Sequence, residues 1–278
     1  MRTYKTVADE ITETVIFADV IDVYEELAGG KLRRIKTKII ETRDFFEGLS
    51  RLSTEVGSDF HTTLEHEKPK EASVFIAANA GLFGDIVEKI FRLFIDYVKA
   101  TKPDVFVTGR RGAELMRDYA PGIDFHLLNF PDDRFDEADF NELAKRVVIY
   151  PKITVFYGKF HNLVIQRPDK GELSGQLFPQ NPEELHLLAK KRMTYLYEPT
   201  IFGVSELFTQ EVYTGVLEQM VLEAQLSKLA SRVMHLDAAT SKVNEQLFLL
   251  EDDKRKIKKQ IGDKKQNELM AKVIGRKF

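Results

Sequence analysis

Two glycine-containing turns are the places where this sequence comes nearest to the chemistry of a nucleotide site. Ala77–Asp85 (AANAGLFGD) and Gly109–Gly112 (GRRG) each follow a short apolar run and precede a helical pattern. A helix N-terminus behind glycines can bind phosphate through its free N–H groups. The first turn has neither G-x-G-x-x-G spacing nor a following Gly-Lys-Ser/Thr, so neither a dinucleotide site nor a P-loop is supported. The second is an anion-site candidate or, as we favour, a tight connection with solvated arginines.

The histidines and acids form no catalytic or metal-binding pattern. The six histidines are scattered, and none shows His-Glu-x-x-His or other ligand spacing. The absence of cysteine excludes disulfides, thiolate ligands and a cysteine nucleophile, and fits a reducing compartment. We interpret the adjacent acids Asp132-Asp133 and Asp252-Asp253 as solvated charge, because neighbours in sequence do not face each other on a helix. The sequence therefore predicts no cofactor, no metal and no catalytic group.

The composition argues against a nucleic-acid-binding protein and a membrane-spanning protein. With a net charge of −3 over 278 residues, the chain lacks the overall positive charge that attracts nucleic acid. No run of about 20 apolar residues predicts a membrane span, and the first residues resemble neither a secretory signal nor a transit peptide. We therefore expect a cytosolic protein. A charged fraction of 31% favours long exposed helices over a compact enzyme.

Both ends of the chain carry a heptad-like pattern. Apolar residues recur at alternating steps of four and three, which is typical of a coiled-coil seam. The last seventy residues carry one seam: Leu222, Leu226, Leu229, Val233, Leu236, Thr240, Val243, Leu247, Leu250, Lys254, Ile257, Ile261. The first fifty residues carry the other: Ile11, Thr14, Ala18, Ile21, Glu25, Ala28, Leu32, Ile35, Ile39, Thr42, Phe46, Leu49. We expect the two terminal helices to pair as one antiparallel coiled coil.

The middle of the chain alternates between strand and helix patterns, which predicts an α/β layer with a parallel core. The expected strands are Ala72–Ala78, Asp104–Thr108 and Ile123–Leu128, followed by a hairpin of Ile153–Phe160 and Leu163–Arg167. The expected helices are Asp85–Ala100, Gly109–Tyr119 and Asp136–Tyr150. Asp169–Asn181 has the glycine and proline of a loop, and Leu185–Tyr197 is either a strand or a helix.

The predicted fold class is therefore α/β with a long coiled coil. Residues 1–57 and 205–278 form the antiparallel shaft, and residues 58–204 form a small Rossmann-like α/β domain inserted between them. The first helix runs from about Thr6 to Val56 and the last from about Val204 almost to Phe278, which approaches 100 Å at 1.5 Å per residue. The pair Gly29-Gly30 inside the first helix marks a hinge or permits another surface to approach closely.

A dense basic run lies near the end of the last helix and includes Lys254, Arg255, Lys258 and Lys259. It is either a solubilising face, which also suits the helix dipole, or a contact with an acidic protein surface.

Six matches in chain order point to one known family. Lys31–Arg34 matches a KLRR segment, Phe75–Ile86 a strand followed by a D-x-G-L-C-G-G turn, and Val107–Gly112 an I-G-R-K-G segment. The hairpin Val155–Arg167 with Gln176–Pro179 matches a Y-x-x-F region that ends in L-L-P. Ala230–Val233 and Met234–Thr240 match A-S-R-M-x-A-M-x-A-A-T most specifically, and Glu268 and Gly275 keep the spacing of a last signature. On these segments the chain resembles the gamma subunit of F-type ATP synthases.

The chain departs from the family pattern in the segments that meet the catalytic subunits in the family. Ile21–Glu26 replaces the basic K-I-T-K-A-M stretch, so acidic residues (Asp22, Glu25 and Glu26) stand where relatives have basic ones. Asp252–Arg255 lies near the place of the missing N-K-x-R-Q stretch. The resemblance implies that these acids, together with Lys254, Arg255, Lys258, Lys259 and Glu268, contact partner subunits.

The resemblance also implies a function. Members of the family are rotor shafts inside a ring of three alpha and three beta subunits, joined to an epsilon-type subunit and a membrane c-ring. They bind no nucleotide or nucleic acid, and they lie peripherally at the cytoplasmic face of the membrane. Two other classes stay open on the residues alone: a phosphate- or nucleotide-binding α/β enzyme with helical arms, and a coiled-coil scaffold.

Overall fold

The computed structural model describes residues 2–56, 70–132, 134–174, 198 and 201–274, with backbone only at 43–44, 46–56, 174, 201–209 and 273–274. Two compact units make up the chain. Unit 1 comprises Met1–Leu27 and Met234–Phe278, and unit 2 comprises Ala28–Val233. The long helices α1 (Tyr4–Val56) and α6 (Ile201–Ile274) contribute to both units.

Unit 2 contains a five-stranded sheet in the order β3-β2-β1-β4-β5. Its first four strands are parallel and β5 is antiparallel to β4. The strands are β1 (Ala72–Ile76), β2 (Asp104–Thr108), β3 (His126–Leu128), β4 (Lys152–Phe160) and β5 (Gln166–Ser174). The central strands are apolar on both sides, as expected where helices cover both faces of a parallel sheet.

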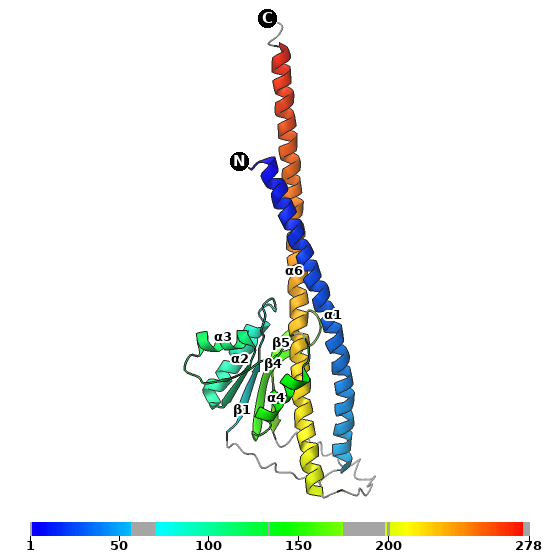
Figure 1. Cartoon of the computed structure of the whole chain (residues 1–278), viewed down its shortest axis with the longest axis vertical. Coiled ribbons are helices and arrows are strands. Elements are labelled where there is room, and N and C mark those ends of the chain that lie inside the picture. Colours follow the sequence, from blue (N-terminus) through cyan, green and yellow to red (C-terminus); the bar gives the residue numbers. More distant parts are fainter. Residues whose placement is uncertain (1, 57–69, 133, 175–197, 199–200, 275–278) are drawn as a thin grey trace. The chain divides into compact units, whose positions relative to one another are not determined.

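Helices cover the sheet on two faces (Figure 1). On one face, α2 (Ile86–Thr101) and α3 (Arg110–Tyr119) bury a core around Phe75 and Phe94. On the other, α4 (Glu137–Val147) and α6 bury a second core around Val74 and Tyr213. Adjacent β1 residues thus point into different cores, because side chains alternate across a strand.

Two glycines let α6 lie close to the sheet. A Cβ added to Gly158 of β4 would lie 2.5 Å from Ser227 Oγ, and one added to Gly171 of β5 would collide with Met220. Both neighbours belong to α6. Glycine at these positions therefore sets the short distance between α6 and the β4–β5 part of the sheet.

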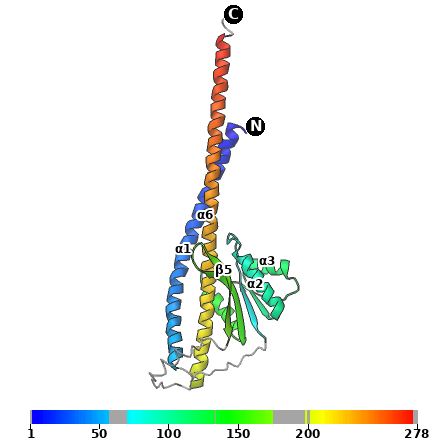
Figure 2. The same ribbon diagram turned by 180° about the vertical axis from the view of Figure 1, so that it is seen from behind.

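The two long helices pair in each unit, as the heptad pattern of the sequence predicted. In unit 2, Leu32, Ile35 and Ile39 pack with Leu222, Leu226 and Leu229. In unit 1, Ile21 packs with Leu236 and Val243. Arg2 meets Asp253 in unit 1, so residue numbers fall along α1 as they rise along α6, and the pair is antiparallel. Figure 2 shows α1 and α6 from behind.

The prediction for β5 was wrong in its bounds. The strand begins at Gln166 rather than Leu163 and runs to Ser174, through residues expected to form a loop. Pro168 and Gly171 suggested a loop, but β5 is an edge strand in this sheet, and an edge strand tolerates a residue that cannot donate a ladder hydrogen bond. The predicted strand at Ile123 is also shorter and begins at His126. Leu185–Tyr197 lies outside the described residues.

Gly29 and Gly30 lie inside the continuous α1 helix, and a Cβ added to either would meet nothing within 4 Å. Close approach of another part of the described chain therefore does not explain them. We expect Gly29→Ala with Gly30→Ala to raise the free energy of unfolding by about 1–2 kcal/mol, since alanine is favoured over glycine by about 1 kcal/mol in a helix. Urea denaturation followed by circular dichroism measures this. An unchanged or lower stability would contradict a simple propensity effect and favour a strained or hinged backbone.

Candidate functional site

The carboxyl end of the parallel strands carries a buried ion pair between the α/β layer and α6. Lys228 Nζ lies 3.0 Å from Asp132 Oδ1, and the two side chains are 3% and 7% exposed. Lys228 Nζ also donates to Ala77 O at 2.8 Å, just after β1. A buried pair of this kind is tolerable when further hydrogen bonds satisfy both ions, and here they do.

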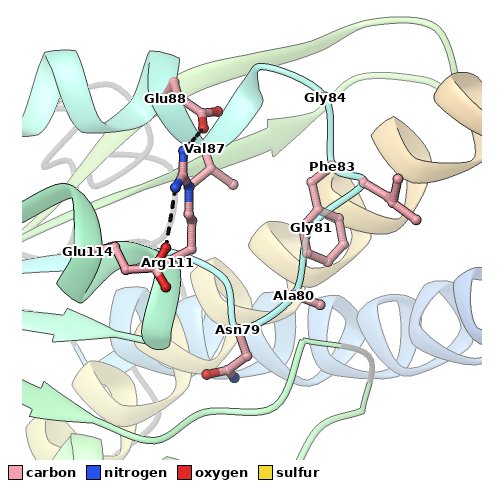
Figure 3. Close-up of a pocket in the computed structure, with 10 residues that line it drawn as sticks. Asn79, Ala80, Gly81, Phe83, Gly84, Val87, Glu88, Arg111 and Glu114 are labelled. Carbon is pink, nitrogen blue, oxygen red and sulfur yellow. Dashed lines mark hydrogen bonds and ion pairs between the residues drawn. The ribbon is translucent and has the colours of Figure 1, made fainter.

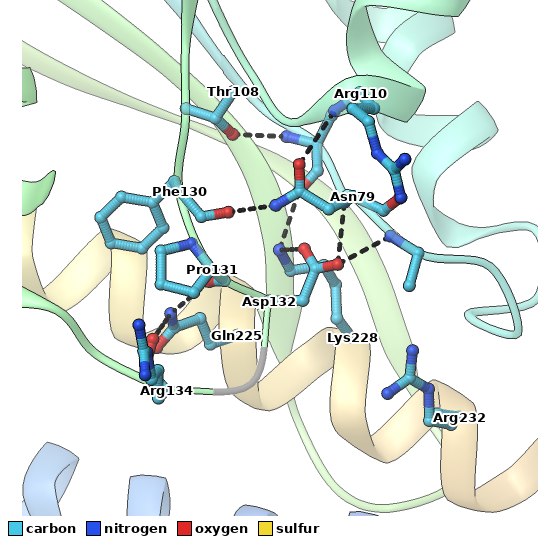
Figure 4. A network of polar contacts seen from close by, with 12 residues as sticks. Asn79, Thr108, Arg110, Phe130, Pro131, Asp132, Arg134, Gln225, Lys228 and Arg232 are labelled. Atoms are coloured by element: carbon cyan, nitrogen blue, oxygen red, sulfur yellow. Dashed lines mark hydrogen bonds and ion pairs between the residues drawn. The ribbon is translucent and has the colours of Figure 1, made fainter.

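Asp132 also binds the turn that follows β1. Its Oδ2 accepts from Asn79 N at 2.8 Å and Ala80 N at 2.9 Å (Figure 4). In doubly wound folds, ligands bind at the carboxyl ends of the strands where the strand order reverses, often through such N–H groups. In this sheet that place lies between β1 and β4. The Asp132 carboxylate occupies the N–H groups that a phosphate would need, and Lys228 of α6 neutralises it.

Further α6 side chains bind the same loops. Gln225 Nε2 donates to Pro131 O at 2.9 Å and to Arg134 O at 2.7 Å. Ser231 Oγ donates to Phe83 O at 2.7 Å. These contacts hold the loops on both sides of the ion pair against α6.

Arg232 extends this set by one turn of the helix. Its guanidinium lies 4.1 Å from the centre of the Phe83 ring and donates to Gly81 O at 3.0 Å. We call this set of contacts the junction. Its members are Asn79, Asp132, Gln225, Lys228, Ser231 and Arg232.

Asn79 connects the junction to the second glycine turn. Its Oδ1 accepts from Arg110 N at 3.1 Å, and its amide donates to Phe130 O. Gly109 precedes Arg110 at φ +77°, and a Cβ there would lie 2.6 Å from the carbonyl carbon of Ala78. The turn needs glycine for both its conformation and its closeness to β1, so it is a tight connection within the described residues.

A hollow of about 420 Å³ opens beside the junction, lined by residues 79–84 and by Val87, Glu88, Arg111 and Glu114 (Figure 3). Arg111 lies between the two acids, with Nη2 3.0 Å from Glu88 and Nη1 3.3 Å from Glu114. Hydrogen bonds to these carboxylates raise the pKa of Arg111. Arg111 is therefore exposed, as expected, but its guanidinium is already neutralised by two carboxylates.

Asp132 corrects one expectation. The sequence suggested solvated charge at Asp132-Asp133, but Asp132 is buried and paired, and Asp133 lies outside the described residues. Asp132 lies in a loop, so the helix-spacing argument did not apply to it. Asp252 is half-buried on α6 and pairs with Lys256 at 2.6 Å.

The predicted contact residues lie in unit 1. Asp22 and Glu26 are exposed on α1, and Glu25 is half-buried at the seam. On α6, Arg255, Lys258, Lys259 and Glu268 are exposed, and Lys254 is half-buried with Nζ 5.7 Å from the centre of the Tyr4 ring.

Asp22, Glu25 and Glu26 lie close to Ile21, which packs against Leu236, whereas Lys254 lies beside Tyr4 at the start of α1. The acidic and the basic residues are therefore separated along the length of the helix pair. Their contacts with partner subunits stay a prediction.

Lys228, Gln225 and Asp132 were not predicted as a site. The sequence did hold one indication that this part of α6 is buried. Residues 212–231 are apolar on a second face besides the seam, which carries Val212, Leu217, Val221 and Ala224. A helix that is apolar on all sides is a buried helix. A lysine and a glutamine inside such a helix need buried partners, which the sequence does not identify.

Within the described residues, no cluster of three or more histidines and acids is arranged to hold a metal ion. No described helix combines the length and apolarity that a membrane span needs.

Comparison with known proteins gives consistent matches over most of the chain. A family model described as ATP synthase matches residues 3–260. The ATP synthase gamma chain of Mycoplasma mycoides is 23% identical over 254 residues and covers 87% of each chain. That of Halothermothrix orenii is 22% identical over 263 residues, with 88% of this chain and 89% of the relative covered.

Solved structures match in fold. A chain of the Euglena gracilis mitochondrial ATP synthase, in a structure of its OSCP, F1 and c-ring, gives a TM-score of 0.63 at 12% identity, covering 98% of this chain and 94% of that one. A chain of the central stalk and c-ring of the Tetrahymena thermophila mitochondrial ATP synthase gives 0.57 at 15% identity, covering 79% and 99%.

Proposed function

We propose that this chain, which belongs to the ATP synthase gamma family, is the central-stalk rotor of a rotary ATP synthase or ATPase. One observation carries the proposal furthest. In unit 1, α6 continues past the start of α1 as a helix whose residues 258–272 are all exposed (Figure 1). We call this segment the overhang. Among the described residues none buries this segment, over some four turns, and since helices in proteins are stabilised mainly by packing, the overhang is suited to enclosure by another molecule.

The proposed role is non-catalytic. The N–H groups of the turn after β1, where a nucleotide phosphate would bind in this class of sheet, are taken by Asp132. Catalysis would then belong to partner subunits, whose nucleotide states the rotor favours in turn by contacting each state differently.

The proposed partners are three alpha and three beta subunits around the coiled coil, an epsilon-type subunit and a membrane c-ring. The names of the similar structures, which include a c-ring and a central stalk, support this assignment. The complex would lie at the cytoplasmic face of the membrane with this chain as a peripheral component. The division into a shaft of residues 1–57 and 205–278 and a domain of residues 58–204 stays part of the proposal.

Affinity purification of the tagged chain from its own cell tests the function. We expect two larger ATPase subunits of unequal sequence in equal amounts, and an ATP hydrolysis activity that belongs to the complex. Purification of the chain with no ATPase subunit, or as a scaffold of its own copies only, would reject the rotor assignment.

The basic run that leads into the overhang gives a charge prediction. Lys254→Glu, Arg255→Glu, Lys258→Glu and Lys259→Glu together reverse this run, of which Lys258 and Lys259 belong to the overhang. We expect weaker assembly or lost coupling of ATP hydrolysis, with the defect largest at low salt, because charges are screened over about 8 Å at physiological ionic strength. Co-purified subunits and ATPase rates measure this.

A matched control makes the same change in net charge within the α/β layer, at the exposed residues Arg92, Lys99, Arg117 and Lys145. Equal defects in both variants would show that net charge, rather than the basic run, is what matters.

A further inference from the structure

Three donors converge on the carboxylate of Asp132 at the carboxyl end of β1. The N–H groups of Asn79 and Ala80 donate to Oδ2 at 2.8 and 2.9 Å, and Lys228 Nζ lies 3.0 Å from Oδ1 (Figure 4). Two successive backbone N–H groups beside a cation are the kind of donors with which proteins bind a free oxyanion. We call these three donors the cradle.

The loop that carries Asp132 is fastened by contacts that do not involve its carboxylate. Gln225 Nε2 donates to backbone carbonyls on both sides of it, to Pro131 O at 2.9 Å and to Arg134 O at 2.7 Å. A change confined to the carboxylate therefore leaves this loop attached to α6. The cradle stays preformed for another occupant, which lowers the cost of binding one.

The cradle borders the hollow described above. Asn79 and Ala80, whose N–H groups belong to the cradle, also line that hollow of about 420 Å³ (Figure 3). A small ion thus has a short route to the cradle. Because the side chains of Lys228 and Asp132 are 3% and 7% exposed, an ion bound there would be largely withdrawn from water, where electrostatic contacts are stronger.

Size and charge select the ion. The present occupant is one carboxyl group with a single negative charge beside Lys228. A small carboxylate ion such as formate has the same shape and restores the same charge. A phosphate dianion is larger and would add a second negative charge to a buried site, which is unfavourable.

We propose that the cradle is a carboxylate-binding site that the chain fills with its own side chain. Asp132 is the tethered ligand, and a free carboxylate binds in its place when that side chain is removed. The inference does not depend on the proposed function. Tethering gives the ligand a high effective concentration, so the contact between α6 and the sheet in unit 2 is insensitive to phosphate and nucleotides around the protein.

Chemical rescue of the full chain tests the proposal. Asp132→Ala removes the carboxylate and leaves room for formate. We expect sodium formate, at ten times its dissociation constant, to raise the melting temperature of this variant by about 3–6 °C relative to sodium chloride at the same concentration. Asp132→Gly leaves room for one more carbon, so acetate should become the better ligand. Calorimetric titration of the folded variants measures the dissociation constants.

Two kinds of control accompany the rescue. The wild-type chain and Asp132→Asn should show no specific shift with formate or phosphate, because a carboxylate or an amide already fills the cradle. Asp132→Ala combined with Lys228→Met should lose the rescue, since the cation that holds the ion is gone.

Each outcome decides the proposal. Equal shifts in formate and chloride, or in the wild type and Asp132→Ala, would indicate a general salt effect and overturn it. A larger shift with phosphate than with formate overturns carboxylate as the ligand class. Rescue that persists without Lys228 places the ion elsewhere. Variants that stay unfolded in formate and in acetate would show that the cradle does not form without Asp132, and reject the site as well.

Discussion

Lys228→Met is expected to destabilise unit 2 by about 3–5 kcal/mol, the usual cost of removing one partner from a buried ion pair. Methionine keeps most of the side-chain volume, so the loss comes from Asp132, which keeps two backbone donors but no cation, and from Ala77 O. Urea denaturation measured by circular dichroism gives the free energy of unfolding. Lys242→Met is the control, because Lys242 is exposed on the same helix, and should change stability by less than about 0.5 kcal/mol.

A double-mutant cycle with Asp132→Asn isolates the pair. Asparagine is uncharged at this position, so the double variant should lose less stability than the sum of the two single variants, by about 1–3 kcal/mol. Additive losses would show that Lys228 and Asp132 act independently. A loss below 1 kcal/mol for Lys228→Met alone would show that the junction contributes little to stability.

Gly109→Ala is expected to destabilise the α/β layer by about 2–6 kcal/mol. Two costs add: a backbone conformation at φ +77° and ψ 155° that is almost exclusive to glycine, about 1–3 kcal/mol, and overpacking against the Ala78 carbonyl, about 1–3 kcal/mol. The second cost is difficult to relieve because the obstructing atoms are backbone atoms of the turn that Asp132 holds.

Gly122→Ala is the matched control for this change. An added Cβ there meets nothing within 4 Å and φ is not positive, so its stability should change little. Thermal unfolding of the two variants measured side by side tests the pair. Similar melting temperatures for both would contradict the assigned turn geometry.

The sequence predicted the fold well where one physical signal dominated. The seam of α1 and α6 was readable because the steps of three and four persist through Ile21, Leu32 and Leu229. Strand β2 was predicted with its observed bounds, since Asp104–Thr108 is a short apolar run between helical patterns. Strand β5 was not, because the tolerance of an edge strand for Pro168 depends on a pairing that the sequence does not display.

The junction was the hardest feature to predict. Asp132 and Lys228 are 96 positions apart, and nothing in either neighbourhood indicates that they meet. The motif Ala230–Val233 was recognisable as a family feature, but its reason appears only in the fold, where Ser231 and Arg232 bind the carbonyls of Phe83 and Gly81. Side-chain contacts to backbone carbonyls leave little trace in composition or periodicity.

The enclosure of α6 has a mechanical consequence. Every residue from Met220 to Ser231 is buried, so this stretch of helix has no solvent-facing side. Turning it about its own axis relative to the sheet would withdraw Lys228 from Asp132 and move Ser227 and Met220 away from Gly158 and Gly171, toward strand neighbours that carry side chains. The helix segment and the sheet should therefore rotate together as one rigid part. A torque applied to α6 at this level is transmitted to the sheet, and a torque applied to the sheet is transmitted to α6 through the same contacts.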